Sequence, residues 1–347
     1  MRTLPPWDAL LKQMVWRQLD DWRGMRILDF GSGGGDTAAH LSQWNDVIAV
    51  EPSAEMLADR AEGAYEQLCG GIELVAAMPD ASFDGVICHN VLEYVPDRAA
   101  VLRELTRVLR PGGRMSVVKH NRAGRVFQMA VLLDDQRKAH TLLDGLDGAS
   151  SQFGTIHYYE DEDVTAACPP LRLEKTLGLR TFWDLQQRQE KHPDPAWQQE
   201  MLRLEARVSE MPEYCAVAFF HHLLLRNNPA AMREHIFRRA MDMYGVAPDY
   251  PWAKTPESAV LRHPHNRKWF ALVMPVTRRA LGLPGEGVID VMNVKCDPLL
   301  TVSLRQQPGF RPAYHMNKEK WLTILLDGSV PPEKIDGLLA LSYDLTC

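Results

Sequence analysis

The sequence lacks any apolar run of the about 20 residues that a transmembrane helix needs, so we expect no membrane span. Its six cysteines are scattered and none forms a Cys-x-x-Cys pair, which gives no sign of a zinc or dithiol site. The first 22 residues include Asp8, Asp20 and Asp21 and have no apolar core, unlike a signal peptide. These absences predict a cytoplasmic protein with reduced thiols and no metal.

The charge of the 347-residue chain is uneven. Residues 1–226 contain 24 Lys and Arg against 33 Asp and Glu, whereas residues 227–347 contain 15 against 12. A turn-rich break at Asn227-Asn228-Pro229 separates the two stretches. We therefore expect two domains, at 1–226 and 230–347. A net charge of −9 gives the first domain no general attraction to nucleic acid, so such binding would need a local basic patch.

Short apolar runs alternate with amphipathic segments in the first domain. Predicted strands cover 26–31, 47–50, 72–76, 83–88, 114–118, 171–176 and 216–225. Predicted helices cover 7–22, 36–44, 53–68 and 97–109, and a helical insertion is expected over 127–170. Strands that alternate with helices predict a Rossmann-like α/β fold, with a largely parallel seven-stranded sheet and helices on both faces.

The sharpest motif is the loop Ile27-Leu-Asp-Phe-Gly-Ser-Gly-Gly-Gly-Asp36, with Gly31, Gly33 and Gly35 at alternate positions. Glycines there allow a tight turn and a close approach of the backbone to a ligand. In open α/β sheets, ligands bind beyond the carboxyl ends of the strands, where this loop lies. The next predicted strand ends at Glu51, whose carboxylate can accept both hydroxyls of a ribose. The pattern predicts a nucleoside ligand.

Two carboxylates distinguish between the candidate nucleosides. A dinucleotide-binding loop places a pyrophosphate at the start of its helix, but Asp36 would repel that group. Asp29, ahead of the loop, suits a cationic ligand. S-adenosylmethionine (AdoMet) carries a sulfonium and an ammonium and no phosphate, so the charges favour AdoMet over NAD. A loop that only forms a turn is the structural alternative.

The glycine loop, the acid-ended second strand and the turn Arg110-Pro-Gly-Gly113 occur in an order that resembles class I AdoMet-dependent methyltransferases over residues 1–226. The resemblance implies that Gly31 and Ser32 contact the methionine part of the cofactor, and that His89 lies near the methyl-donor end. It also implies that Glu51 holds the ribose. Together with the loop residues, the predicted cofactor-binding set is Asp29, Gly31, Ser32, Gly33, Gly35, Glu51, Met78 and His89, in which Met78, like Asp80, is a candidate for adenine.

Three further segments resemble the SmtA/CmoM group of methyltransferases, which includes tRNA 5-carboxymethoxyuridine methyltransferases. They are His89-Asn-Val-Leu-Glu-Tyr-Val95, Val118-Lys-His-Asn121 and Gly178-Leu-Arg-Thr-Phe-Trp-Asp184. This resemblance implies tRNA as partner and a methyl ester on the acid of a modified wobble uridine as product. Two alternatives stay open: methylation of a small-molecule acid or other metabolite, and AdoMet binding without turnover.

A carboxylate acceptor is ionised near pH 7 and needs no general base. It does need a cationic or hydrogen-bonding clamp, and we predict Lys119, Asn121 and Arg180 as catalytic residues, with His120 and Arg122 as further candidates. The structural alternatives are a solvated loop for the cations and a turn for Asn121. An Asn/Asp-Pro-Pro-Tyr/Phe block after the fourth strand is absent, which disfavours adenine methylation in DNA.

Residues 230–347 resemble the YjbR/MmcQ family, which implies a small α+β domain of CyaY-like topology. Basic and aromatic residues are interleaved there and could grip a phosphate backbone, or could form surface ion pairs over a Trp-anchored core. They are Lys295, Arg311, Tyr314, His315, Asn317, Lys318, Lys320 and Trp321. The C-terminal domain could equally serve oligomerisation or regulation.

Overall fold

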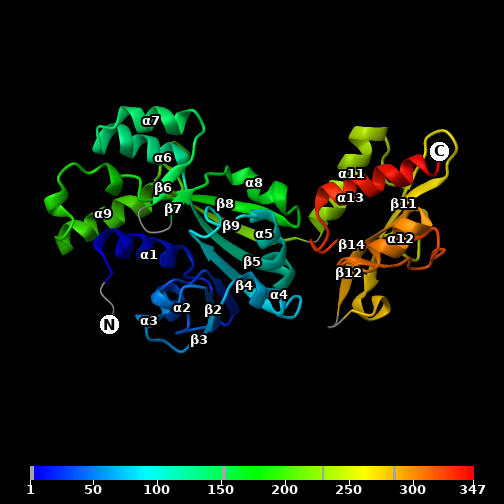
Figure 1. Ribbon diagram of the computed structural model, residues 1–347, viewed down its shortest axis with the longest axis horizontal. Coiled ribbons are helices and arrows are strands. Elements are labelled where there is room, and N and C mark those ends of the chain that lie inside the picture. Colours follow the sequence, from blue (N-terminus) through cyan, green and yellow to red (C-terminus); the bar gives the residue numbers. More distant parts are fainter. Residues whose placement is uncertain (1–3, 151–153, 229, 284–286) are drawn as a thin grey trace. The chain divides into compact units, whose positions relative to one another are not determined.

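The computed structural model describes residues 4–150, 154–228, 230–283 and 287–347 (Figure 1). The chain divides into two compact units. The first comprises residues 1–101, 108–163 and 173–226, and the second comprises 102–107, 164–172 and 227–347. The predicted boundary between 226 and 230 stays a prediction. No described helix is long and apolar enough to cross a bilayer.

The first unit is built on a seven-stranded mixed sheet in the order β3-β2-β1-β4-β5-β9-β8. The strands are β1 Arg26–Phe30, β2 Asp46–Glu51, β3 Glu66–Cys69, β4 Phe83–His89, β5 Leu109–His120, β8 Leu171–Leu179 and β9 Phe220–Asn227. β1 to β5 pair in parallel, and β9 runs antiparallel to β5. The predicted Rossmann-like fold is confirmed. The carboxyl ends of β1, β2, β4 and β5 meet at one edge, called here the carboxyl edge.

Helices cover this sheet (Figure 1). They are α1 Pro6–Gln18, α2 Asp36–Leu41, α3 Ala54–Ala58, α4 Ile72–Ala76, α5 Arg98–Val108, α6 Arg122–Phe127, α7 Gln136–Leu143, α8 Asp161–Ala167, α9 Pro195–Val208 and α10 Pro212–Cys215. A π-helical turn at Gln128–Leu132 and 3-10 turns at Trp183–Leu185 and Gln189–Lys191 complete the set. The predicted helical insertion therefore exists, and it also contains the hairpin β6 Gly148–Ser150 and β7 Gly154–Ile156.

Helix α1 forms because Pro6 suits its first turn and its apolar side chains share one face. Leu10, Met14 and Val15 are buried from this face against a core that includes Ile27 of β1. Helix α9 adds Leu202 to the same core, so α1 and α9 together cover one face of the sheet.

The third strand is not where the sequence predicted it. The predicted helix over 53–68 ends at Ala58, and Glu66–Cys69 pairs with β2 as the third strand, whereas Ile72–Ala76 is helix α4. Ser53 does cap α3 as predicted, because its hydroxyl accepts from the Met56 N–H at 3.2 Å. Gly63, in the connection between α3 and the third strand, passes close to α2, because a Cβ there would lie 2.8 Å from the Ala39 Cα. The short run at 72–76 fits a strand and a helix equally well by periodicity alone.

The second unit has a five-stranded antiparallel sheet in the order β10-β11-β12-β14-β13. Its strands are β10 Ala259–Arg262, β11 Trp269–Thr277, β12 Val288–Lys295, β13 Phe310–Pro312 and β14 Trp321–Leu325. Its helices are α11 Ala230–Tyr244, α12 Pro298–Leu304 and α13 Pro332–Asp344, with a 3-10 turn at Arg278–Leu281. Met232 and Ile236 of α11 share a buried core with Phe270 of the sheet. This is the α+β domain that the sequence predicted.

Candidate functional site

The glycine loop between β1 and α2 turns tightly at the carboxyl edge. Gly31 has a φ of 73°, and its N–H donates to the Val50 carbonyl at 2.8 Å. A Cβ atom on Gly31 would overlap Val91 Cγ2. Gly35 caps α2 with a φ of 75°, and a Cβ there would overlap the Tyr65 hydroxyl. Glycine is therefore required twice in this loop, for its backbone angle and for the space that it leaves.

Glu51 closes the loop from the end of β2. Its side chain is buried, with Oε2 accepting from the Gly33 N–H at 2.9 Å and Oε1 accepting from the Ser53 N–H at 2.9 Å. A carboxylate has about four acceptor positions, so two remain for the hydroxyls of a ribose. The structure therefore places this acid beside the loop glycines, as the sequence reasoning required.

Asp29 is a buried carboxyl group with a missing partner. Its Oδ2 has no hydrogen-bond partner among the described residues, and burial raises the pKa of Asp29 to about 7, with a small opposing effect from the charge of Lys12. Asp29 lines a narrow cavity of about 60 Å³ together with Ser32 and His89. A buried, unpaired acceptor is costly unless a ligand satisfies it. The cavity therefore suits a cationic group.

The raised pKa of Asp29 predicts that the affinity for AdoMet depends on pH. In the free protein Asp29 is protonated below pH 7, whereas a cationic ligand prefers the ionised form. We expect the affinity for AdoMet to level off about one pH unit above 7 and to fall by up to about tenfold per pH unit below 7. Isothermal titration calorimetry between about pH 5.5 and pH 8.5 measures this. Asp29→Asn is expected to bind weakly with no slope, and a flat wild-type profile would contradict the assignment.

Lys119, predicted as part of a clamp for the acceptor acid, lies in a buried ion pair. It is 2% exposed and its Nζ lies 2.9 Å from Asp161 Oδ1. His221 Nδ1 and Thr176 Oγ1 also contact the Asp161 carboxylate, at 3.0 and 3.1 Å. Burial would raise the pKa of Asp161, but the hydrogen bond and charge of His221 and the charge of Lys119 hold it below its usual value. Lys119 is committed to this buried ion pair.

Asn121, predicted as a catalytic residue, has a structural role in the protein. It is the N-cap of α6, with its Oδ1 accepting from the Ala123 N–H at 3.2 Å. Its Nδ2 donates to the carbonyls of Ala216 and Ala218 at 3.0 and 2.8 Å. Both of these hydrogen bonds from Nδ2 are made within the protein, and a catalytic role of Asn121 stays a prediction. The turn alternative is the one that the structure supports.

Arg180 also turns inward. It is 7% exposed, and it forms a two-pronged ion pair in which Nε and Nη2 donate to the two Asp184 oxygens at 2.8 and 2.5 Å. Its guanidinium lies 5.2 Å from the ring centres of Phe219 and Phe220. The sequence predicted that Arg180 binds the carboxylate of a substrate. In the structure the carboxylate of Asp184 occupies the guanidinium instead.

Met78 does not fit the adenine role. Since Glu66–Cys69 is the third strand, the loop that follows it at the carboxyl edge is Gly70-Gly71, and Met78 comes after α4. β4 starts at Phe83 and runs parallel to β1, so Met78 and Asp80 precede the opposite edge of the sheet. The assignment depended on taking 72–76 as the third strand.

Sequence reasoning missed a buried polar cluster at the carboxyl edge. Glu93 is fully buried; its Oε1 accepts from the His120 N–H at 2.7 Å, while its Oε2 has no partner in the described part of the chain. His120 Nδ1, Tyr158 OH and Tyr159 OH are likewise unsatisfied among the described residues. Burial raises the pKa of Glu93 to about 7. The signal was Glu93 itself, an acid placed just after the fourth strand.

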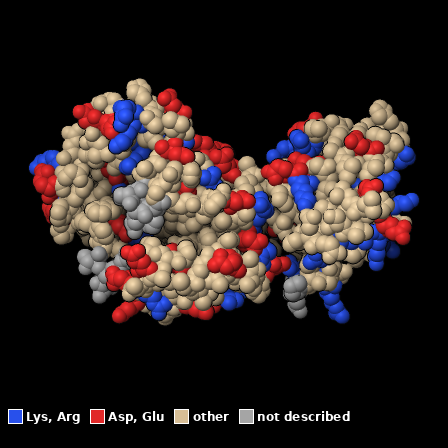
Figure 2. Space-filling model, in the orientation of Figure 1, with Lys and Arg blue, Asp and Glu red and all other residues tan. Residues whose placement is uncertain are grey.

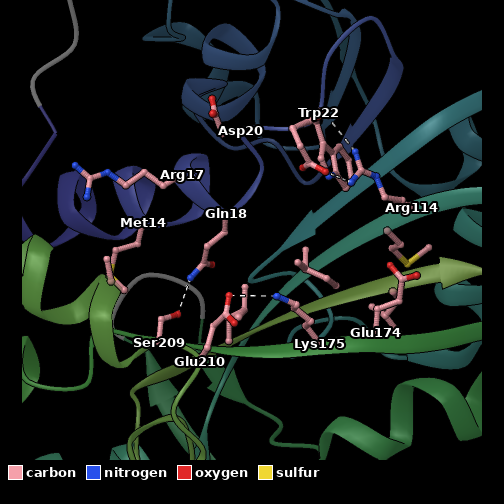
Figure 3. A pocket seen from close by; sticks show the side chains of 16 residues that line it. Met14, Arg17, Gln18, Asp20, Trp22, Arg114, Glu174, Lys175, Ser209 and Glu210 are labelled. Atoms are coloured by element: carbon pink, nitrogen blue, oxygen red, sulfur yellow. Dashed lines mark hydrogen bonds and ion pairs between the residues drawn. The ribbon is translucent and has the colours of Figure 1, made fainter.

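A larger cavity, of about 720 Å³, lies elsewhere in the first unit (Figure 3). Trp22, which precedes β1, and Arg114, which pairs with Gly85 near the start of β4, line this cavity. The cavity therefore lies at the edge of the sheet opposite the glycine loop. Ion pairs occupy its charged rim, such as Lys175 with Glu210 at 3.2 Å. Its position keeps it from being the cofactor site, in spite of its size. No group of three or more potential metal-ligating side chains occurs among the described residues.

Comparison with known proteins identifies two families in the chain. Residues 28–117 match the family described as a methyltransferase domain, and residues 241–345 match the YjbR family. The tRNA 5-carboxymethoxyuridine methyltransferase of Escherichia coli is 26% identical over 242 residues, which cover 62% of this chain and 88% of that protein. The YyaQ protein of Bacillus subtilis is 45% identical over 114 residues, 33% of this chain and 97% of that protein.

Other relatives match only in part. The ubiquinone biosynthesis O-methyltransferase of Xanthomonas oryzae is 34% identical over 120 residues, and the chain spans about half the length of this relative, with 50% covered. A crystal structure from Pseudomonas syringae shares 43% identity over 33% of this chain and 98% of that chain, with a TM-score of 0.33. A methyltransferase structure from Mesorhizobium loti shares 20% identity over 64% of this chain and 98% of that chain, with a TM-score of 0.39.

The fold, the glycine loop and the family match define an AdoMet-dependent methyltransferase. The chain matches the methyltransferase-domain family over residues 28–117, and it belongs to the YjbR family through residues 241–345, where it covers 97% of the YyaQ protein at 45% identity. The unsatisfied Asp29 oxygen fits the cationic methionine end of AdoMet, and the free acceptor positions of Glu51 fit its ribose.

Proposed function

We propose that the chain transfers the methyl group of AdoMet to a carboxylate of a modified wobble uridine in tRNA, forming a methyl ester. The observation that carries the proposal is a group of three arginines without carboxylate partners near the carboxyl edge, Arg98, Arg122 and Arg125. Support comes also from the E. coli tRNA methyltransferase, whose similarity extends over 88% of its length, whereas the O-methyltransferase of X. oryzae matches over half of its own.

The three arginines are held by neutral groups. Arg122 Nη1 donates to the carbonyls of Leu142 and Leu146, and its guanidinium lies 4.8 Å from the Tyr158 ring centre. Arg125 hydrogen-bonds the Gln128 side chain. No carboxylate contacts either arginine among the described residues.

The third arginine, Arg98, is held in the same way. Its Nε donates to the Leu92 carbonyl at 3.1 Å, and its guanidinium lies 3.9 Å from the Tyr159 ring centre. Guanidinium groups fixed by carbonyls and rings keep their positive charge available for an anion.

The reaction is an in-line displacement that AdoMet makes possible by supplying a methyl group on a positively charged sulfur. The substrate carboxylate oxygen forms a bond to the methyl carbon while the carbon–sulfur bond breaks, and S-adenosylhomocysteine leaves. The acceptor is already ionised, so no proton moves. The protein must orient the acid, exclude water and hold the cofactor. Asp29 and Glu51 hold the cofactor, and the three arginines bind and orient the carboxylate of the substrate.

The surface charge supports a local rather than a general attraction for RNA. Figure 2 shows acidic and basic side chains interspersed over the face in view. The net charge of residues 1–226 is −9 and that of residues 227–347 is +3. We propose that the arginine group and the basic C-terminal domain guide RNA, since an acidic surface would otherwise repel phosphates.

A second candidate is methylation of a hydroxyl group on a small molecule, which Glu93 favours. A hydroxyl acceptor needs a general base, and a buried carboxyl with a free oxygen and a pKa of about 7 has the right properties. Glu93→Gln separates the candidates. A carboxylate acceptor predicts nearly unchanged turnover at saturating substrate, whereas loss of a general base predicts a decrease of about 10²–10⁴-fold.

The proposal is tested by incubating the purified chain with methyl-labelled AdoMet and bulk tRNA from a strain that lacks the wobble-ester methyltransferase. We expect label in the tRNA. Arg125→Met is expected to lower kcat/KM for tRNA by about tenfold or more, the effect of losing a hydrogen bond to a charged group, with unchanged AdoMet affinity. Arg137→Met is the matched control, because it removes one exposed charge from the same insertion. Label only in small molecules would overturn the proposal.

A further inference from the structure

A row of polar side chains crosses the buried sheet beneath α1. His89 at the end of β4, Ser116 of β5 and His222 of β9 share one face. His89 Nε2 lies 2.7 Å from Ser116 Oγ, which lies 2.6 Å from His222 Nε2. Ser116 and His222 are fully buried. The methyl transfer proposed above uses none of these three side chains.

The row continues into α1 and the end of α9. His222 Nδ1 lies 2.6 Å from Gln18 Oε1, and Gln18 Nε2 donates to Ser209 Oγ at 2.8 Å, as Figure 3 shows for Gln18 and Ser209. Ser209 Oγ in turn donates to the Gly178 carbonyl at 2.8 Å. Five side chains thus form one continuous chain of hydrogen bonds that ends on a backbone oxygen.

We call this chain of hydrogen bonds, from His89 to the Gly178 carbonyl, the relay. The backbone oxygen at its end sets the donor and the acceptor in every one of its hydrogen bonds. A carbonyl only accepts, so Ser209 donates to it and must accept from the Gln18 amide nitrogen. Gln18 then turns its oxygen to His222, whose Nδ1 carries the proton and whose Nε2 is bare. Ser116 donates to that bare nitrogen and accepts from His89.

The direction fixes the tautomer of His89. Its Nε2 carries the proton that Ser116 accepts, so its Nδ1 is a lone-pair acceptor. Burial lowers the pKa of His222 to about 3. Burial also lowers the pKa of His89 well below its usual value, and the neighbouring His222 lowers it further. Both rings therefore stay neutral at physiological pH, which the direction of the relay requires.

The free nitrogen belongs to a residue of the cofactor cavity. His89 lines that cavity with Asp29 and is only partly buried, and its Nδ1 has no hydrogen-bond partner within the described ranges. We infer that His89 Nδ1 accepts a hydrogen bond from the ammonium of the cofactor's methionine end, beside Asp29. Ser116, His222 and Gln18 are positioning residues that keep His89 in the accepting tautomer.

Gln18→Met is expected to reverse the relay. Methionine offers His222 Nδ1–H no acceptor, so the proton of His222 moves to Nε2 and Ser116 donates to His89 instead. His89 Nδ1 then carries a proton and faces the ammonium as a donor. Gln18 lines the large cavity, so methionine fits without repacking. Gln18→Glu is the matched control, because its carboxylate still accepts from His222 and keeps the relay direction.

Two measurements test this inference. Long-range ¹H–¹⁵N correlation spectra report the His89 tautomer, and we expect the Nε2–H form in the wild type and in Gln18→Glu but the Nδ1–H form in Gln18→Met. Calorimetry with S-adenosylhomocysteine, which has the amino-acid end, is expected to show about tenfold weaker binding to Gln18→Met. Methylthioadenosine, which lacks that end, is expected to bind equally to all three.

Ser116→Ala provides a second break in the relay if Gln18→Met does not fold. It leaves His89 Nε2–H without an acceptor, and the same change of tautomer and of S-adenosylhomocysteine affinity is expected. An unchanged His89 tautomer in a folded variant, or an equal loss of affinity for both ligands, would overturn the inference. The second result would show a general distortion of the site rather than a lost acceptor.

Discussion

Gly31→Ala is expected to abolish detectable AdoMet binding while leaving the protein folded. The new Cβ would overlap Val91 Cγ2, and the φ of 73° is one that alanine adopts only under strain. Relief requires the β-branched Val91 side chain to turn from its position or the glycine loop to move away from the segment after β4. That movement would displace the loop that Glu51 holds through Gly33. Calorimetry with AdoMet measures the loss.

Gly112→Ala is the matched control for this substitution. Its φ is 78°, but no atom lies within 4 Å of the position where its Cβ would be built. It shares the backbone strain, of about 1–2 kcal/mol, without the steric overlap, and we expect normal AdoMet affinity. Equal affinities of Gly31→Ala and the wild type would show that this loop does not hold the cofactor.

Asp184→Ala is expected to lower the free energy of unfolding by about 3–5 kcal/mol, the cost of leaving a buried charge without its partner. The side chains of Arg180 and Asp184 are 9% and 7% exposed, and their two hydrogen bonds would both be lost. Gln128, which also donates to Asp184 at 3.3 Å, would lose that acceptor. Urea-induced unfolding measures the change.

An exposed ion pair provides the comparison for this prediction. Arg188 and Glu190 lie 2.9 Å apart, with their side chains 66% and 65% exposed. Exposed pairs contribute little to stability, so Glu190→Ala is expected to change the free energy of unfolding little. A small effect of Asp184→Ala on stability together with a large loss of turnover would show that Arg180 acts in the active site, and would contradict a purely structural role of the ion pair.

The first two strands and the loop between them were predictable, because their signals are local. A buried strand, alternate glycines and an acid at the end of the next strand each depend on neighbouring residues, and the structure brings Gly33 and Glu51 together. The third strand was misplaced because Ile72–Ala76 is too short for its period to separate strand from helix. The pairing of Glu66–Cys69 with β2, which makes this segment the third strand, is visible only in three dimensions.

The predicted clamp residues show a different limit of sequence reasoning. A sequence shows that Lys119 and Arg180 are cations, but it does not show which carboxylates reach them. Asp161 is 42 residues from Lys119, and the segments that contain them meet only through the tertiary fold. Arg98 and Glu93 are the reverse case, because nothing in the sequence marked them as site residues. In the structure both lie at the carboxyl edge, Arg98 held by a carbonyl and an aromatic ring, and Glu93 with one oxygen that has no partner among the described residues.

The most direct test of the proposed function is the stability of the transferred methyl group in mild alkali. A methyl ester on a carboxylate hydrolyses and releases labelled methanol, and this is the result that we predict for tRNA labelled by the wild-type chain. Label that stays on the tRNA after alkali would place the methyl group on a base or ribose atom and would contradict a carboxylate acceptor.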